Sequence, residues 1–400
     1  MNTHFCLLTI FALILALLLS LALGHVICAV NTQETHVEVS SCVDITSPGY
    51  YYLSSRISGV QGSADRCIGI YADNVVLDGN GYSLEGGGRG DGIFVYKSRN
   101  VTVKNIAVRG YDIGITFDGS SNGVIENAVV VDCNWPGIYF ALSSLNTIVN
   151  VTVKNSQSGI YLYNSSSNTI LNTVVSNSGP GIWLVGSSNN TIINVTATGN
   201  SDGVLISVLS NGNAVLNSTV VNNVCGLSIG LSSHNTIANN VVSGNTYGLC
   251  FQNSSNNLIY NNYFKNLNAI HVYDESAPNT WNTTKATGRN IVGGGYLGGN
   301  YWSDPEEKGF SDTCIDSDGD GFCDEPFVID ENNVDYYPLK PQPAPTPAEA
   351  VIKPTTPLQT TTPSPATMPP AVSDYVIAVG VGLAIVVAIV VALTTLRREK

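Results

Sequence analysis

The sequence predicts an all-β fold, a parallel β-helix of about nine or ten turns. Three features predict it: a repeat of about 22 residues, one glycine followed by alternating apolar residues in each repeat, and columns of asparagine in register. Repeats this short are typical of solenoids. The units consist mainly of Asn, Ser, Thr, Gly, Val and Ile, which are poor helix formers, so a leucine-rich repeat with a helical outer side is disfavoured.

Both ends of the chain predict export and anchoring. An apolar run over 5–23 followed by small residues is typical of a secretory signal, so we assign 1–29 to a signal peptide. Residues 340–373 are rich in Pro, Thr, Ala and Ser and predict an extended stalk, while 374–396 predict one transmembrane helix. The basic tail 397–400 then lies in the cytoplasm, and a removed C-terminal sorting signal is the alternative. The ectodomain is therefore expected at the cell surface.

The repeats occupy 74–275, between an N-terminal cap with the first strands at 30–73 and a C-terminal cap at 276–339. Asparagines mark the register in steps of 22 or 23 residues: Asn146, Asn168, Asn190, Asn213, Asn235, Asn257 and Asn279. Each unit also has a segment such as "GIYL" at 159. Side chains alternate along a strand, so Ile160 and Leu162 are expected to point inward and Tyr161 outward.

A second asparagine column lies four residues after each register mark, and we interpret it as a ladder inside the coil. Its members are Asn127, Asn150, Asn172, Asn194, Asn217, Asn239 and Asn261. The alternative is an exposed row at a turn. An internal ladder would exclude glycosylation of the N-x-[ST] sequons at Asn150, Asn194 and Asn217, so the expected glycosylation sites are Asn164, Asn253 and Asn282.

An outward aromatic stripe predicts a glycan-binding surface. Its members are Phe94, Tyr139, Tyr161, Tyr163 and Trp183, and three of them stand on consecutive turns, about 4.8 Å apart. That spacing is close to the repeat of an extended sugar chain, and aromatic rings stack on sugar faces. The alternative is a ladder of rings that only stiffens the sheet.

"DSDGDGFCDE" predicts a structural calcium site in the C-terminal cap. Its ligands would be Asp316, Asp318, Asp320, the carbonyl of Phe322, and Asp324. A sensor loop would have Glu at its twelfth position, but this loop has Phe327 there, and Pro326 opposes a following helix. The expected cofactor is thus a calcium ion that orders the cap, and a plain acidic turn is the alternative.

Seven cysteines remain after the signal region, and an odd number argues against a full disulfide framework. The best pair is Cys314–Cys323, which would close the calcium loop, and Cys42–Cys67 is second. Free buried thiols suit Cys133, Cys225 and Cys250 better.

The repeats, the start "GYYYLSSRISG" and the end "GGNYWSD…VDYYPL" together resemble the NosD-like parallel β-helix proteins of archaeal surfaces, over roughly 36–339. The resemblance implies a right-handed coil closed by an N-terminal strand and a C-terminal cap, of the pectate-lyase-like kind shared with sugar-binding and sugar-cleaving proteins. The family is named for a periplasmic protein linked to copper insertion. Kinship of fold supports the architecture more than any activity.

The leading function is a non-catalytic, membrane-anchored surface protein that is carbohydrate-binding, adhesive or structural. One alternative is a polysaccharide lyase or glycosidase, for which the acids of the early turns beside Arg89 and Arg109 are the candidates. Another is a copper accessory protein, although His36, His234 and His271 are the only histidines after the signal region. A net charge of −13 without clustered Lys or Arg excludes nucleic acid as the expected partner.

Overall fold

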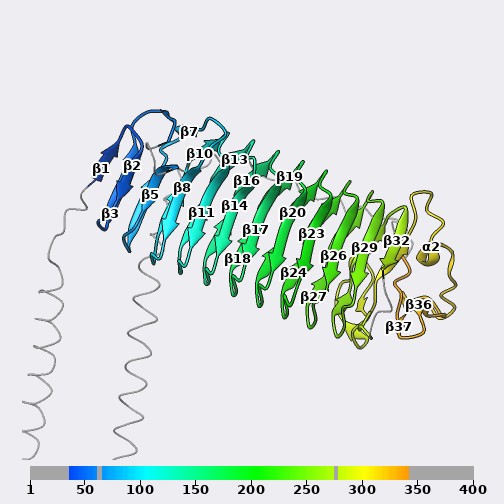
Figure 1. Ribbon diagram of the computed structural model, residues 1–400. Coiled ribbons are helices and arrows are strands. Elements are labelled where there is room, and N and C mark those ends of the chain that lie inside the picture. The colour runs from blue at the N-terminus through cyan, green and yellow to red at the C-terminus, as the bar shows by residue number, and fades with distance from the viewer. Residues whose placement is uncertain (1–35, 61–64, 274–277, 342–400) are drawn as a thin grey trace, which may run out of the picture. The chain divides into compact units, whose positions relative to one another are not determined.

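The computed structural model describes residues 36–60, 65–273 and 278–341 (Figure 1). The predicted signal peptide, membrane helix and cytoplasmic tail lie outside these residues, as does the stalk after its first two positions. Within the described ranges, no helix is both long and apolar enough to cross a bilayer.

The described chain coils into a parallel β-helix in which three sheets of eleven strands run the length of the solenoid (Figure 1). Each full turn gives one strand to sheet A, then one to sheet C, then one to sheet B. Sheet A contains β1 (His36–Val39), β3 (Gly49–Leu53), β6 (Val75–Asp78), β9 (Thr102–Lys104), β12 (Val124–Glu126), β15 (Thr147–Val149), β18 (Thr169–Leu171), β21 (Thr191–Ile193), β24 (Ala214–Leu216), β27 (Thr236–Ala238) and β30 (Leu258–Tyr260).

Sheets B and C complete the coil. Sheet B contains β2 (Val43–Ile45), β5 (Arg66–Ile70), β8 (Asp91–Tyr96), β11 (Ile113–Asp118), β14 (Pro136–Ala141), β17 (Ser158–Tyr163), β20 (Pro180–Val185), β23 (Asp202–Ser207), β26 (Cys225–Gly230), β29 (Tyr247–Gln252) and β32 (Asn268–Val272). Sheet C contains β4 (Ile57–Ser58), β7 (Ser83–Glu85), β10 (Ala107–Arg109), β13 (Val129–Val131), β16 (Thr152–Lys154), β19 (Val174–Ser176), β22 (Thr196–Thr198), β25 (Thr219–Val221), β28 (Val241–Ser243), β31 (Tyr263–Lys265) and β35 (Tyr301–Ser303).

The core is a set of mainly aliphatic columns, two of which come from sheet B. Ile160 and Leu162 of β17 are fully buried, as the alternation predicts, and Tyr161 and Tyr163 face outward. The glycine before Ile160 lies inside the strand, and not at a bend. A Cβ on Gly159 would lie 2.2 Å from a methyl of Val175 and 2.4 Å from the carbonyl oxygen of the next turn's glycine. The glycine column therefore lets sheets B and C meet at close range.

The internal amide ladder is formed by the register column itself. The backbone N–H and Nδ2 of Asn168 donate to Oδ1 of Asn190 over 2.8 and 3.2 Å, and Asn190 repeats this with Asn213. The pattern continues from Asn146 to Asn279, and all but the last of these side chains are at most 1% exposed. Each amide thus satisfies a buried backbone donor of the turn before it.

The column predicted as the internal ladder lies instead at the bend from sheet A to sheet C, and that prediction is wrong for most of its members. Asn127, Asn150, Asn172, Asn194 and Asn217 are exposed, Asn239 is half-buried, and Asn261 is buried. All seven have φ between 50° and 61°, the left-handed conformation that Asn tolerates better than most residues. A tight bend, and not an interior hydrogen bond, therefore explains why asparagine recurs here.

Two amide ladders end on the C-terminal hairpin of β36 (Phe327–Asp330) and β37 (Asn333–Asp335). Oδ1 of Asn333 accepts the backbone N–H of Asn279 at 2.9 Å and indole Nε1 of Trp281 at 3.0 Å. Oδ2 of Asp335 accepts the backbone N–H of Asn300 at 2.8 Å. The cap thus supplies the acceptors that a following turn would otherwise provide.

The cap also covers the end of the apolar core. Trp302 of β35 is 1% exposed, and its ring lies 4.8 Å from that of Phe264 and 4.7 Å from that of Phe327. A short pair, β33 (Ala286–Thr287) with β34 (Tyr296–Leu297), and the single turn α2 (Phe310–Thr313) complete this region.

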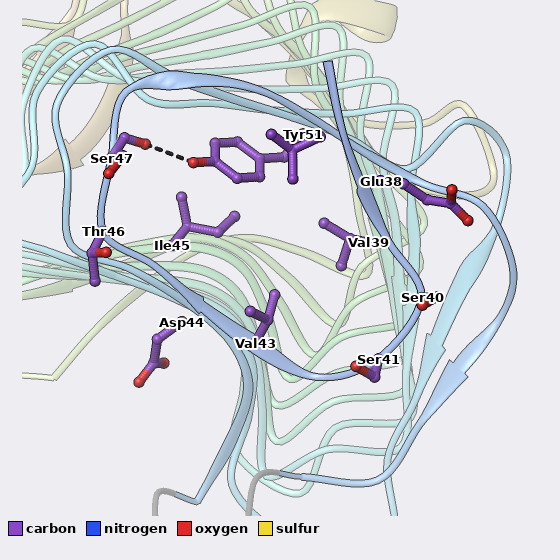
Figure 2. Close-up of a pocket in the computed structure, with 11 residues that line it drawn as sticks. Glu38, Val39, Ser40, Ser41, Val43, Asp44, Ile45, Thr46, Ser47 and Tyr51 are labelled. Carbon is purple, nitrogen blue, oxygen red and sulfur yellow. Dashed lines mark hydrogen bonds between the residues drawn. The ribbon is translucent and has the colours of Figure 1, made fainter. Parts of the chain in front are cut away.

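At the N-terminal end, the first turn surrounds a hollow of about 210 Å³ (Figure 2). Val39, Ile45 and Tyr51 point toward its centre, and the Tyr51 hydroxyl donates to the carbonyl of Ser47 at 3.0 Å. Among the described strands, β1, β2 and β4 each pair on one side only.

Candidate carbohydrate-binding face and calcium loop

The predicted aromatic stripe lies on the outer face of sheet B. Strand pairing puts Tyr139, Tyr161 and Trp183 in one row on β14, β17 and β20. Their rings stack on one another, at 5.3 Å between Tyr139 and Tyr161 and 4.6 Å between Tyr161 and Trp183. Tyr163, 40% exposed, stands beside the row and is tilted 54° to Tyr161.

The stacking determines which surfaces of these rings a sugar could contact. Rings that lie within about 5 Å and 21° of parallel cover each other's faces. The row therefore presents ring edges along its length, and the flat platform expected from the sequence is not formed. Burial in the row raises the pKa of Tyr161 and Tyr139, so both hydroxyls stay protonated and able to donate at neutral pH.

Phe94 belongs to a separate aromatic group in the earlier turns. Its ring stacks on Tyr96 at 5.8 Å, and the guanidinium of Arg66 lies 5.8 Å from its centre. Thr116, its partner on the next strand, is 3% exposed and separates it from Tyr139. The stripe is thus divided into two groups.

Acids are the main charged side chains of sheet B. Arg66 is the only Lys or Arg within the described strands of this sheet, and it pairs with Asp44 at 3.2 Å. Asp91 pairs in register with Arg66, whereas Asp118 and Asp202 pair with uncharged residues on both neighbouring strands. Burial raises the pKa of Asp91 to about 6.

Three acids of the early turns lie near one another, since burial and then the charges of Asp112 and Asp65 raise the pKa of Asp91. Asp112 accepts the backbone N–H of Gly90 and the amide of Asn134, and Asp65 forms an ion pair with Arg89 at 2.8 Å. These bonds hold the loop before β8. From 133 to 268, Asp202 is the only acid of the sequence, so the turns that bear the ring row lack a second carboxylate.

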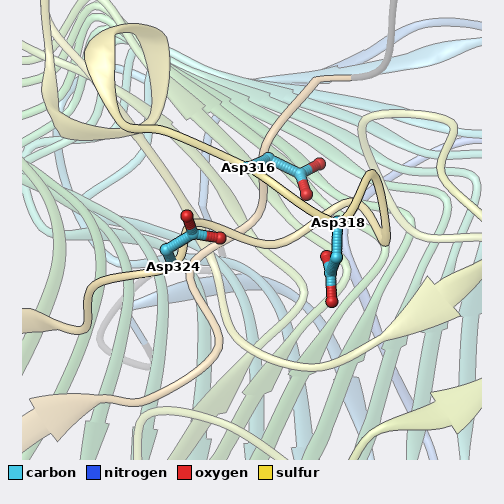
Figure 3. Close-up of side chains that lie close together, drawn as sticks. All are labelled: Asp316, Asp318 and Asp324. Carbon is cyan, nitrogen blue, oxygen red and sulfur yellow. The ribbon is translucent and has the colours of Figure 1, made fainter.

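The calcium loop brings three of its predicted ligands together (Figure 3). Carboxylate oxygens of Asp316, Asp318 and Asp324 all lie within 4.8 Å of one another. Asp316 also accepts the backbone N–H groups of Gly319 and Gly321 at 2.8 and 3.0 Å, which closes the turn.

Asp320, the fourth predicted carboxylate, is not part of that group. The carboxylate of Asp320 pairs with the ammonium of Lys285, which also lies 4.7 Å from the centre of the Tyr296 ring. Phe322 is 4% exposed and packs in the cap. Oxygen donors suit a hard cation such as Ca²⁺, and recruiting Asp320 would require it to leave Lys285.

Three disulfides are present among the described cysteines. The predicted pairs Cys314–Cys323 and Cys42–Cys67 are joined, and Cys133 is a buried free thiol. The prediction that Cys225 and Cys250 are free is wrong, because they form the third bridge. The two cysteines of each coil disulfide are 25 residues apart. Cys225 and Cys250 lie on the adjacent strands β26 and β29 of sheet B, whereas Cys67 lies in β5 and Cys42 just before β2. That shared spacing was the signal for the missed bridge.

The expected glycosylation sites differ in their surroundings. Asn164 and Asn253 are exposed at the bend from sheet B to sheet A. Asn282 is half-buried in the cap, where its Oδ1 accepts the backbone N–H of Tyr336 at 3.1 Å and its Nδ2 donates to a carbonyl at 3.2 Å.

A family model described as "Periplasmic copper-binding protein (NosD)" matches residues 53–207 and 137–307. The two matches cover more than half of the chain and coincide with the coil. The chain belongs to the NosD family. That description places the family in the periplasm, which supports export of this chain. The three disulfides agree with an oxidising compartment.

The described part of this NosD-family chain does not gather ligands that suit copper. Its histidines lie on separate turns: His36 contacts Tyr50, His234 lies at a bend, and His271 lies between the rings of Tyr247 and Tyr273. Cys250 pairs with His271 across strands, but its sulfur is in a disulfide. Among the described side chains, the only group of three metal-ligating residues is the acidic one in the cap.

Several solved structures resemble this chain in fold. They include a mutant of the periplasmic alginate epimerase AlgG (16% identity, TM-score 0.47, 60% of this chain and 65% of that one) and the catalytic domain of a GH87 alpha-1,3-glucanase (13%, 0.42, 62% and 62%). Another is DFA-IIIase from Arthrobacter chlorophenolicus A6 (12%, 0.50, 60% and 80%). Identities this low show the fold alone. No curated protein matches the NosD-family chain.

Proposed function

We propose that the protein is an exported, non-catalytic surface module that binds a carbohydrate chain along the outer face of sheet B. The observation that supports this most is the ring row of Tyr139, Tyr161 and Trp183, on turns that have only one acid. Ring edges and tyrosine hydroxyls would contact successive sugars, and Tyr163 would add an exposed ring face. Residues 374–396 would anchor the module in the membrane.

The charge of this face favours an uncharged glycan over a polyuronate. Three carboxylates on sheet B, Asp91, Asp118 and Asp202, would repel an anionic chain, and the only guanidinium on its strands is already paired. Lys97, at the bend after β8, lies 4.8 Å from the centre of the Tyr96 ring and is the nearest further cation of that turn. Uncharged glucans or mannans should therefore bind more tightly than alginate or polygalacturonate.

Changing both Tyr161 and Trp183 to Ala should weaken glycan binding at least tenfold, because the row loses two of its three rings. Binding would be measured on a glycan array and then by calorimetry with the best ligand. Circular dichroism would verify that the coil persists. Tyr82→Ala is the control, since Tyr82 is 40% exposed but lies at the bend between sheets A and C.

Three results would contradict the proposal. The double variant could bind as well as the parent, the parent could bind no glycan, or the parent could release reducing ends from a bound polysaccharide. The last result would favour the enzyme alternative, with Asp91 as the first residue to test.

We also propose that a calcium ion orders the C-terminal cap through the carboxylates of Asp316, Asp318, Asp320 and Asp324 and the carbonyl of Phe322. The support is the convergence of three of these carboxylates at one point, in a loop closed by a disulfide. The calcium concentration outside the cell would be high enough to fill even a weak site of this kind.

Chelation should lower the melting temperature by about 3 °C, the effect of a ligand at roughly ten times its Kd on a domain of this size. Calorimetry in chelator and in millimolar calcium would measure the shift. Asp318→Asn should abolish most of it, while Asp304→Asn, outside the loop, should leave it intact. An equal melting temperature with and without calcium would contradict the proposal that a calcium ion orders the cap.

A further inference from the structure

The described chain contains eight N-x-[ST] sequons, and none falls on an asparagine of the buried ladders. They are Asn100, Asn150, Asn164, Asn189, Asn194, Asn217, Asn253 and Asn282. The first seven are exposed, and Asn282 is half-buried. Acceptor sequons and structural asparagines are thus separated by position.

The fold explains this separation. A ladder residue such as Asn168 is followed two positions later by Ile170, which must point into the core. A bend residue such as Asn150 is followed by buried Val151 and then by Thr152, which is the first, outward residue of β16. Of these two columns, only the bend column has an outward Ser or Thr where a sequon needs it.

From this geometry we infer that Asn150, Asn194 and Asn217, at the bend from sheet A to sheet C, are N-glycosylation acceptors. Each is exposed in a left-handed turn, with φ of 52° to 55°. The side-chain hydrogen bonds recorded in this column are long: Nδ2 of Asn150 donates to Asn127 over 3.4 Å, and Nδ2 of Asn194 donates to Asn172 over 3.3 Å. A glycosylated Nδ2 keeps one hydrogen, so such a bond can persist after modification.

The donor would be an oligosaccharide on a lipid diphosphate. Nδ2 forms a bond to C1 of the first sugar, the bond from C1 to the phosphate oxygen breaks, and the lipid diphosphate leaves while a base takes the amide proton. The inference needs export of the chain, which the family supports, and does not depend on glycan binding by sheet B.

The spacing of the acceptors limits their occupancy. Asn194 and Asn217 lie on adjacent turns, about 4.8 Å apart, whereas Asn150 and Asn194 are separated by two turns. Neighbouring oligosaccharides would collide at the shorter distance, so modification of one of the adjacent pair should reduce that of the other. The modified corner joins sheets A and C, so its glycans would leave the outer face of sheet B uncovered.

The test is glycopeptide mass spectrometry of the full chain secreted from cells that modify N-x-[ST] acceptors. We expect near-complete occupancy at Asn150, occupancy shared between Asn194 and Asn217, and little at Asn282. Asn217→Gln should raise occupancy at Asn194 at least twofold. An amidase that removes N-glycans should release those at the bend from the folded protein.

A gain-of-site variant provides the matched control. Val174 is 37% exposed and pairs in register with Thr152 and Thr196, so Val174→Thr fits the strand and creates a sequon at Asn172. A glycan at Asn172 is expected with folding unchanged, together with lower occupancy at Asn150 and Asn194, which lie one turn away on either side. Bare Asn150, Asn194 and Asn217 in the parent, with glycans only at other sequons, would overturn the inference.

Discussion

Replacing Asp335 with alanine is expected to lower the free energy of unfolding by about 3–5 kcal/mol. The side chain is fully buried, and its carboxylate accepts the backbone N–H of Asn300 at 2.8 Å and indole Nε1 of Trp302 at 2.9 Å. Alanine would leave both donors without an acceptor beneath the cap. Urea unfolding at constant pH would measure the loss.

Asp335→Asn should cost much less, because an amide oxygen can accept the same donors, as Asn333 does at the end of the neighbouring ladder. A loss for Asp335→Ala below about 1 kcal/mol would contradict the role of this residue as a ladder terminus.

The parent and the Asp335→Asn variant also test the pH dependence of stability. Burial raises the pKa of Asp335 to about 7, above its ordinary value of 3.8. The folded state thus binds a proton more tightly than the unfolded state, so this group stabilises the protein as the pH falls from about 7 toward 4, by up to about 1.4 kcal/mol per pH unit. The Asn variant lacks this contribution. The stability difference between parent and variant should therefore shift in favour of the parent on acidification, whereas a constant difference from pH 7.5 to 5 would contradict the raised pKa.

Replacing Asn213 with alanine should destabilise the middle of the coil by about 3–5 kcal/mol. Its Oδ1 accepts both the backbone N–H and Nδ2 of Asn190, at 2.8 and 3.1 Å, and all of these atoms are buried. The substitution leaves two buried donors unpaired in one turn. Since each turn of a solenoid contacts only its neighbours, the loss should also separate unfolding into two transitions.

Asn172→Gly is the matched control for that experiment. Asn172 is exposed, has φ of 50°, and accepts a single bond of 3.3 Å from Asn194. Glycine adopts this conformation without strain, so the change should stay within about 0.5 kcal/mol. Equal effects of the two substitutions, measured by urea unfolding and hydrogen exchange, would show that the buried column has no special role.

The sequence by itself determined the repeat, the inward column of Ile160 and Leu162 and the composition of the acidic loop. Those features follow from local rules, since a fixed period and alternation along a strand specify which residues can face a core. The Cys314–Cys323 disulfide also follows from a short spacing, since its cysteines are nine residues apart.

Only the tertiary structure decided which asparagine column is buried. Asn168 and Asn172 differ by four residues in one repeat, and both recur in register, so periodicity cannot tell an interior amide from one at a bend. The difference arises from backbone conformation: the bend to sheet C needs a left-handed residue, whereas the register column points across the coil toward the next turn's N–H. Likewise, Tyr161 and Trp183 face outward by sequence, but the distance between adjacent strands made their rings stack on each other.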